Sequence, residues 1–522
     1  MLVKTFCAAV NGLEVTTVTV EVTLARGSVV HFTGLPDNAV KESRDRILAA
    51  ADYIGLKIPL LDITVNMSPA DLRKEGSSYD LPVAIAILGA NKKVDVEHLH
   101  EYMLVGELGL DGRLQPVRGA LPIAIRARAE KFKGLIVPKQ NIREAAVVNN
   151  LDVYGMENLL DVVEFMNGTR HFEPTVIDTR REFYEQQSHF DLDFADVRGQ
   201  QGVKRALEVA AAGGHNLIMV GPPGSGKSML AKRLPGILPP LSLAESLETT
   251  QIHSIAGKIG RGVSLISQRP FRSPHHTISQ VALCGGGQNP QPGEISLAHN
   301  GVLFCDELPE FNKSTLEVLR QPLEDRHITI SRAKYTLDYP ASFMFVASMN
   351  PCPCGYYGDP THNCVCTPGQ IQRYMNKISG PLLDRIDIHC EIQAVPFAEL
   401  SQMEPGESSA AIRERVIAAR KIQTERYNSL PREKQSGARI HCNAQMNERM
   451  LHEFAEPDAA SLDMLRMAMD RLKISARAYS RILKVARTIA DLAGSEKVQS
   501  MHIAEAIGYR NLDRGDWAER GI

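Results

Sequence analysis

The residues with the clearest capacity for chemistry form a glycine-rich stretch that ends in a lysine and a serine. An apolar run at 217–220 is followed by GPPGSGKS and then by the helix-forming residues MLAKRL. This order of strand, G-x-x-x-x-G-K-S loop and helix predicts a loop whose backbone N–H groups surround phosphate oxygens. The flanking strand and helix disfavour the alternative, a glycine-rich turn that binds nothing. The expected nucleotide contacts are Gly221, Pro222, Pro223, Gly224, Ser225, Gly226, Lys227 and Ser228.

Two carboxylates and an amide follow later in the chain. Asp306 and Glu307 end the apolar run VLFCDE, and Asn350 comes just after another apolar run at 343–348. Asp306 would hold Mg²⁺ together with Ser228, while Glu307 would polarise an attacking water. Acids at a strand end can also be simply solvated, and an asparagine there can be a turn residue. After a P-loop, however, these residues predict ATP hydrolysis with Mg²⁺, and Asn350 could bond the γ-phosphate or the water.

Four of the nine cysteines crowd into one short segment with the pattern C-x-C-x₉-C-x-C. Four thiolates in so few residues suit a tetrahedral structural Zn²⁺ site, which leaves no open position for catalysis. The alternative is a reduced loop without metal, and His362 could also replace one thiolate. The expected zinc ligands are Cys352, Cys354, Cys364 and Cys366.

A basic hairpin is the candidate for a nucleic-acid contact. The segment 328–338 alternates like two short strands, with Arg332 and Lys334 at its expected tip. Such residues could contact a nucleic-acid backbone without reading its sequence. A solvated hairpin or a subunit contact is the alternative. The segment 269–287 carries His275 and His276, which could be packing residues or contacts near the nucleotide.

The elements that must position these residues fall into three regions. Residues 1–168 alternate strand and helix patterns and predict an α/β domain, and the polar segment 169–192 predicts a linker. A second α/β unit at 193–397 contains the phosphate motifs and the cysteine-rich insertion at 350–368. The remainder, 408–511, is rich in helix formers and predicts an α-helical lid. The expected fold class is therefore α/β and multidomain.

Composition limits the function classes. The 522 residues carry 59 Lys plus Arg and 61 Asp plus Glu, so the formal charge of −2 excludes a histone-like nucleic-acid binder. The longest apolar run, near 81–90, is half of the roughly 20 residues that a spanning helix needs. An odd number of cysteines argues against a disulfide framework. We therefore expect a cytoplasmic, reduced protein without a membrane segment.

The P-loop, the acidic pair, the asparagine and the helical lid together resemble AAA+ ATPases. The segment PLLDRID resembles the arginine-finger segment of the magnesium-chelatase and replicative-helicase branch, and SARA resembles the lid segment called sensor 2. The resemblance implies that Arg385 enters a neighbouring subunit's site and that Arg477 reads the γ-phosphate in its own subunit. A surface or packing role is the alternative for each arginine. The implied catalytic residues are Glu307, Asn350, Arg385 and Arg477.

The N-terminal region resembles the Lon-protease-like domain over 62–86 and 104–119. Ser78 matches the serine of the Ser–Lys dyad of that fold. The lysine expected just after the VRG turn is absent, since Leu121 and Pro122 occupy that region. A serine without a base is a poor nucleophile, and Lys74 or Lys131 would be an improbable substitute. We therefore expect a non-proteolytic domain.

The whole chain resembles the YifB/ComM family of magnesium-chelatase-like ATPases, carried by GPPGSGKS, FCDELPEF, MNPCPCGYYGD and KISGPLLDRIDIH. This resemblance implies a homo-hexameric ATP-driven motor for branch migration during natural transformation, with single-stranded or branched DNA as partner. Its implied cofactors are ATP, Mg²⁺ and Zn²⁺. Two other functions remain open. One is a chelatase-like ATPase that remodels a protein, although no integrin-like domain follows the lid. The other is a Lon-like protease.

Overall fold

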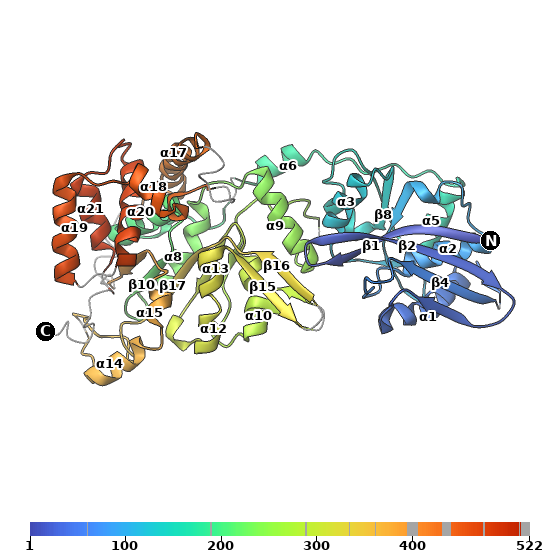
Figure 1. Cartoon of the computed structure of the whole chain (residues 1–522), viewed down its shortest axis with the longest axis horizontal. Helices are drawn as coiled ribbons and strands as arrows, with labels where there is room; N and C mark the ends of the chain where they lie inside the picture. The colour runs from blue at the N-terminus through green and yellow to red at the C-terminus, as the bar shows by residue number, and fades with distance from the viewer. Residues whose placement is uncertain are drawn as a thin grey trace.

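The computed structural model places three regions in succession along the long axis of the molecule (Figure 1). The N-terminal α/β unit lies at one end, the P-loop unit in the middle and the helical lid at the other end. This confirms the predicted multidomain α/β fold with a helical C-terminal region. The structure describes residues 1–59, 61–187, 190–260, 262–287, 290–332, 335–360, 362–393, 406–430, 440–472, 476–510 and 512.

The N-terminal unit is built on a mixed sheet of seven strands in the order β3-β4-β2-β1-β5-β8-β9. Strands β1 (Leu2–Asn11) and β2 (Glu14–Ala25) form a long antiparallel hairpin that turns at Gly12, whose φ is 62°. The alternating valines of β2 face the core, as the sequence pattern predicts. The other strands are β3 (Val30–Thr33), β4 (Asp62–Ser68), β5 (Tyr102–Leu104), β8 (Gly134–Pro138) and β9 (Asp152–Met156).

Helices cover this sheet, and one of them is buried nearly throughout. The helix α2 (Asp80–Ala90) is the apolar run of the sequence, and its side chains fill the core rather than a membrane. Within the described part of the chain, every helix is too short or too polar to span a bilayer. The remaining helices of eight residues or more here are α1 (Asn38–Tyr53), α3 (Ala120–Ala129) and α5 (Leu159–Met166).

The segment 169–192, expected as a linker, contains the helix α6 (Thr179–Gln186). Asp178 caps this helix by accepting a hydrogen bond from the backbone N–H of Arg181 at 3.1 Å. Its one buried apolar side chain, Phe183, belongs to the N-terminal hydrophobic core, which also includes Leu241 and Leu265 of the P-loop unit. Phe183 and the polar contacts of Glu182 with Arg143 and Ser264 therefore hold this charged segment against both units.

The P-loop unit contains a five-stranded parallel sheet in the order β11-β14-β17-β10-β18. The carboxyl ends of parallel strands meet at one edge, so residues that follow these strands lie close together. Its strands are β10 (Leu217–Val220), β11 (Phe271–Arg272), β14 (Val302–Cys305), β17 (Met344–Met349) and β18 (Ile388–Glu391). The helices of this unit include α7 (Gln201–Gly213), α8 (Lys227–Arg233) and α9 (Leu243–Ile255).

The P-loop unit carries two β-hairpins, and the larger of them points toward the N-terminal unit (Figure 1). The predicted basic hairpin forms from β15 (His327–Arg332) and β16 (Tyr335–Pro340), which pair antiparallel. Lys334 and the side chain of Arg332 lie outside the described residues. Leu337 on β16 packs against the turn of the β1–β2 hairpin, where a Cβ on Gly12 would be 3.2 Å from it. The smaller hairpin joins β12 (Gly285–Gly286) to β13 (Gln291–Pro292).

The lid is a helical layer that shares one hydrophobic core with the sheet of the P-loop unit. The region predicted as a helical lid, 408–511, is helical in the structure. Arg477 lies in the first turn of α20, but its side chain is outside the described residues. The helices are α17 (Ser409–Asn428), α18 (Glu448–Phe454), α19 (Ala459–Leu472), α20 (Ala476–Leu492) and α21 (Ser500–Gly508).

Candidate active site

The P-loop joins β10 to α8 with a backbone that needs glycine. Gly224 and Gly226 have φ of 77° and 86°, in the left-handed region that side chains rarely adopt. Gly221 is needed for a different reason, since a Cβ there would be 2.4 Å from the carbonyl oxygen of Ile392. The loop is thus packed closely against the end of β18, which fixes its position at the edge of the sheet.

Lys227 lies inside the curve of this loop. Its ammonium donates to the carbonyl oxygens of Gly221 at 2.7 Å and Pro222 at 2.8 Å, and to Asn350 Oδ1 at 3.3 Å. Burial lowers the pKa of Lys227, while the charges of Asp306 and Glu307 act in the opposite direction. The predicted phosphate lysine and the predicted asparagine are therefore neighbours, although 123 residues separate them in the chain.

Ser228 and Asp306, the two predicted Mg²⁺ ligands, are in direct contact. The Ser228 hydroxyl donates to Asp306 Oδ2 at 2.6 Å. A hydroxyl and a carboxylate oxygen on adjacent elements are donors that Mg²⁺ accepts, with water and phosphate oxygens as further ligands. The other carboxylate oxygen, Oδ1, accepts from the hydroxyl of Ser348 on β17. Ser348 was not predicted as a site residue, although it stands two residues before Asn350.

Glu307, the predicted catalytic carboxylate, has a left-handed backbone with φ 53° and ψ 50°. Such a conformation costs a non-glycine residue about 1–3 kcal/mol and is common at functional sites. Its backbone N–H donates to Ser348 Oγ at 3.3 Å, and its side chain is 58% exposed. The carboxylate therefore projects from the sheet edge into the open, where a water molecule can reach it.

His276 lies beside this carboxylate. Its Nδ1 is 3.7 Å from Glu307 Oε2, and its ring centroid is 4.1 Å from that of His275 and 6.4 Å from that of Phe311. The histidine pair was expected either to pack or to lie near the nucleotide. The structure places His276 at the carboxylate predicted to activate water.

The four predicted zinc ligands converge. The Sγ atoms of Cys352 and Cys354 are 3.3 Å apart, and Cys364 Sγ is 3.7 Å and 3.6 Å from them. All four ligand atoms, including that of Cys366, lie within 4.8 Å of one another. A tetrahedron with Zn–S bonds of about 2.3 Å has sulfur atoms about 3.8 Å apart. The four thiols therefore fit a structural Zn²⁺ site.

His362 does not join these thiols in the structure. Its ring stacks on Tyr356 with centroids 4.7 Å apart, and its side chain is 61% exposed. All nine cysteines of the chain are free thiols. The cysteine loop also contacts the nucleotide site, because a Cβ on Gly355 would be 2.6 Å from Pro223 Cδ in the P-loop.

Arg385, the implied arginine finger, lies in the segment before β18. Its guanidinium donates to the Pro381 carbonyl oxygen at 2.7 Å and pairs with Glu324. Only 14% of its side chain is exposed, and its buried Nε has no hydrogen-bond partner among the described residues. To act on a neighbouring subunit, this side chain must leave Glu324, which is 66% exposed.

Two further arginines, in the region 269–287, form hydrogen bonds and ion pairs with other residues of the chain. Arg269 donates to the carbonyl oxygens of Pro239 at 2.6 Å and Asn300 at 2.7 Å. Arg272 forms a two-point ion pair with Glu294 at 2.6 and 2.7 Å. These arginines therefore brace the fold rather than offer charge to a nucleic acid.

The Lon-like dyad is incomplete in the structure as in the sequence. The side chain of Leu121, at the position of the expected lysine, is fully buried. Lys74 is also buried, and its ammonium donates to the carbonyl oxygens of Gly34 at 2.9 Å and of Pro69. Burial lowers the pKa of Lys74. The structure shows this lysine engaged with backbone and not with Ser78.

The same region of the N-terminal unit forms its joint with the P-loop unit. The carboxylate of Glu144 accepts from the backbone N–H of Leu121 at 3.1 Å and from the hydroxyl of Ser254 on α9. The N–H of Gly119 donates to the Ser254 carbonyl oxygen at 3.2 Å. The start of α3, which contains Leu121, is thus covered by α9.

Known proteins resemble this chain over nearly its whole length. It is 43% identical over 511 residues to competence protein ComM of Haemophilus influenzae, covering 98% of this chain and 97% of that protein. It is equally similar to the uncharacterized protein YifB of Escherichia coli, at 43% over 511 residues, 97% and 96% of the two chains. Lon protease 2 of Bacillus subtilis is 29% identical over 157 residues, 27% of each chain.

Family models match three successive segments. Residues 20–141 match subunit ChlI of Mg-chelatase, residues 193–400 match magnesium chelatase, subunit ChlI, and residues 406–510 match the C-terminal part of that subunit. These segments follow the N-terminal unit, the P-loop unit and the lid. The comparisons and the geometry of the site therefore agree on an ATPase of the AAA+ class.

Proposed function

Because this chain belongs to the family of ComM and YifB, the magnesium-chelatase-like AAA+ ATPases, we propose that it is an ATP-driven DNA motor. The proposed assembly is a homo-hexameric ring. Its proposed role is branch migration of recombination intermediates during natural transformation. The relative named as a competence protein supports this role.

The main support for ATPase activity is that four predicted site residues meet at one edge of the sheet. Lys227 contacts Asn350, and Ser228 contacts Asp306. Lys227 would neutralise charge on the β- and γ-phosphates, and Asn350 would orient the γ-phosphate or the attacking water. Glu307 would accept hydrogen bonds from that water and raise its nucleophilicity. Mg²⁺, held by Ser228 and Asp306, would supply charge neutralisation between the phosphates.

The remaining proposed roles concern neighbouring groups. Arg385 would stabilise charge in the site of the next subunit and Arg477 would read the γ-phosphate in its own. The cysteine loop would hold Zn²⁺ as a brace beside the P-loop. DNA contact is assigned to the hairpin of β15 and β16, because this hairpin extends beyond the sheet and the sequence predicts Arg332 and Lys334 for its tip. Contacts of this kind would bind phosphates without sequence preference.

A second candidate is a chelatase-like ATPase that remodels a protein and has no DNA activity. The observation that favours it is the pairing of Arg269 and Arg272 within the chain, which leaves these two charges unavailable to a nucleic acid. Such an ATPase would be stimulated by a protein and indifferent to DNA.

The test measures ATP hydrolysis and three-strand branch migration with the full-length protein, with and without branched DNA. We expect branched DNA to stimulate hydrolysis in the wild type. Lys227→Ala should abolish nucleotide binding, whereas Glu307→Gln should bind ATP and hydrolyse it about 10²- to 10⁴-fold more slowly. Hydrolysis that proceeds while branched DNA is neither bound nor moved would refute the DNA motor and favour the second candidate.

A further inference from the structure

A buried ion pair joins the lid to the segment that carries Arg385. Asp387, two residues after Arg385, pairs with Arg481 on α20. The second carboxylate oxygen lies 3.2 Å from His215 Nδ1 and accepts from the Asn216 N–H at 3.4 Å. Asp387 is 4% exposed and His215 is fully buried, so this carboxylate has its partners inside the protein.

Asn216 fixes the backbone around Arg385 to the central strand. Its side-chain amide donates to the Arg385 carbonyl oxygen at 2.8 Å. Its own carbonyl oxygen accepts from the N–H groups of Asp387 and Ile388, both at 3.0 Å. Asn216 directly precedes β10, the strand that ends in the P-loop. The Arg385 segment is therefore tied to the strand that bears the phosphate loop.

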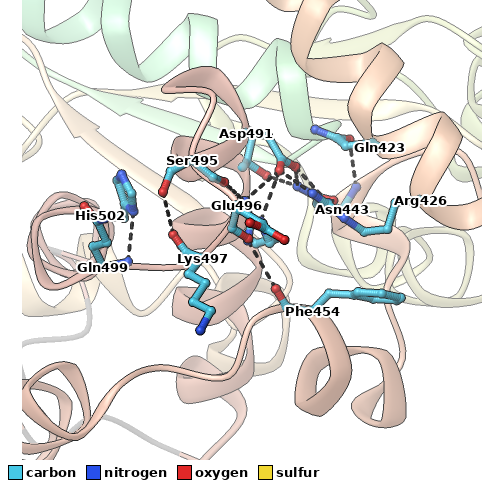
Figure 2. Close-up of polar contacts among 12 residues, drawn as sticks. Gln423, Arg426, Asn443, Phe454, Asp491, Ser495, Glu496, Lys497, Gln499 and His502 are labelled. Atoms are coloured by element: carbon cyan, nitrogen blue, oxygen red, sulfur yellow. Dashed lines mark hydrogen bonds and ion pairs between the residues drawn. The ribbon is translucent and has the colours of Figure 1, made fainter.

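On the lid side, the contacts continue as a connected buried network. His215 Nε2 lies 2.8 Å from Thr488 Oγ1, and the Asn443 side-chain amide donates to Thr488 Oγ1 at 3.0 Å and to Asp491 Oδ2 at 2.8 Å. Figure 2 shows how Asn443 and Asp491 point toward one another and toward Arg426, which pairs with Asp491. The network thus runs from Arg426 in α17 through α20 to the start of β18.

Separating the lid from β18 would leave Asp387 as a buried charge without its guanidinium. Removing one partner of a buried ion pair is strongly destabilising because the remaining charge is uncompensated. The Asp387 carboxylate, the Arg481 guanidinium and the His215 ring therefore hold α20 and the Arg385 segment as one body. A rotation of α20 must carry the Arg385 segment with it.

We propose that Asp387 is a positioning residue that couples Arg385, the finger for the neighbouring subunit's site, to the lid of its own subunit. The inference rests on the proposed role of Arg385 in the ATPase cycle. Arg477, proposed to read the γ-phosphate of the same subunit, lies one helical turn before Arg481 on α20. Nucleotide state in one site is thereby transmitted to the arginine that serves the next.

The test is a double-mutant cycle in full-length protein with Asp387→Asn, Arg385→Ala and the combination. Asp387→Asn keeps the shape of the side chain but removes its charge. We expect kcat to fall about 10- to 100-fold, as for a misplaced catalytic group, with ATP affinity unchanged. In the Arg385→Ala background, Asp387→Asn should cause no further fall, because its effect passes through Arg385. Asp463→Asn, at an exposed position on α19, is the matched control.

Each outcome bears on a different claim. A full, independent fall in kcat in the Arg385→Ala background would overturn the coupling. If Arg385→Ala leaves kcat unchanged, the finger role in the proposed function fails instead. Should Asp387→Asn fail to bind ATP or melt early, Arg481→Lys replaces it, since this variant keeps the positive charge. If the coupling is real, Arg481→Lys should lower kcat by less than the roughly 10- to 100-fold expected for Asp387→Asn. In the Arg385→Ala background, Arg481→Lys should cause no further fall in kcat.

Discussion

At the residue scale, Gly355 forms the close contact between the cysteine loop and the P-loop. Gly355 has φ of 89° and faces Pro223 of the P-loop, where a Cβ would lie 2.6 Å from the proline ring. Neither the backbone nor the ring can yield easily. Gly355→Ala should therefore displace the P-loop and weaken ATP binding by about tenfold, equivalent to roughly 1.4 kcal/mol. Titration with a fluorescent ATP analogue measures this change.

Gly358 offers a matched control for that substitution. Its φ is also positive, at 77°, but nothing lies within 4 Å of the position that its Cβ would occupy. Gly358→Ala introduces a similar backbone strain in the same loop without the contact. Equal losses of ATP affinity in the two variants would show that loop strain, and not the contact with Pro223, is responsible.

The Asp387 carboxyl should leave a signature in the pH dependence of stability. Burial by itself raises its pKa, but Arg481, His215 and Lys484 outweigh burial and hold the pKa below its usual range. The stabilisation is therefore present above the unfolded-state pKa of about 3.9 and lost as pH falls through the folded value. The difference in unfolding free energy between wild type and Asp387→Asn should shrink below about pH 4. Urea unfolding at several pH values tests this, and a constant difference would contradict it.

Most residues of the candidate site were predictable from the sequence because they follow apolar runs. Such runs form parallel strands, whose carboxyl ends meet at one edge of the sheet. Lys227, Asp306 and Asn350 meet there as expected. Ser348 was not predicted, because its role depends on which strand lies alongside β17, whereas His276 lies near the nucleotide site, one of the two places expected for it. A serine at the end of the strand next to the acidic pair is the one signal that could have identified Ser348. No sequence pattern predicts the role of His215, because its partners Asp387 and Thr488 are 172 and 273 residues away in the chain.

At the scale of elements, the cysteine loop follows β17 and packs against the P-loop at Pro223. Cys364→Ser should reduce bound zinc from about one ion per chain to nearly none, because a structural site needs four thiolates. ATP affinity should fall as well, because the loop then loses its fixed contact with Pro223. Elemental analysis and nucleotide titration measure the two effects. Cys284→Ser, outside the cluster, should change neither zinc content nor affinity.

Most elements were predictable because their patterns are long or strongly apolar. The strand and helix patterns of 1–168 and the helix-rich composition of 408–511 correspond to the N-terminal α/β unit and the helical lid. The helix α6 escaped prediction because its composition is charged and only Phe183 is buried. The paired strands β12 and β13 have two residues each, which is too short for any periodicity.

At the scale of the whole molecule, the N-terminal unit contacts the P-loop unit through the start of α3 and the helix α9. The docking contact centres on Glu144, whose pKa burial raises, between the start of α3 and Ser254. Glu144→Ala would leave the Leu121 N–H and the Ser254 hydroxyl without this acceptor, at a cost of about 1–3 kcal/mol. Faster limited proteolysis between the two units is the expected result.

Glu97→Ala provides the comparison, since Glu97 is exposed on the N-terminal unit. Its proteolysis rate should match that of the wild type. If Glu144→Ala is cleaved no faster than Glu97→Ala, other contacts dominate the joint, such as the packing of Phe183 with Leu241 and Leu265.

The ion pair between Asp387 and Arg481 also constrains how the chain matures during synthesis. Its partners are 94 residues apart, and at about 5–20 residues per second the arginine emerges roughly 5 to 20 s after the aspartate. During this interval β18 pairs with β10 without the guanidinium that compensates the carboxylate just before the strand, so the closed sheet is less stable. The nascent P-loop unit would therefore remain open to chaperones until the lid leaves the ribosome. A chain truncated before α20 should accordingly be aggregation-prone rather than a smaller ATPase.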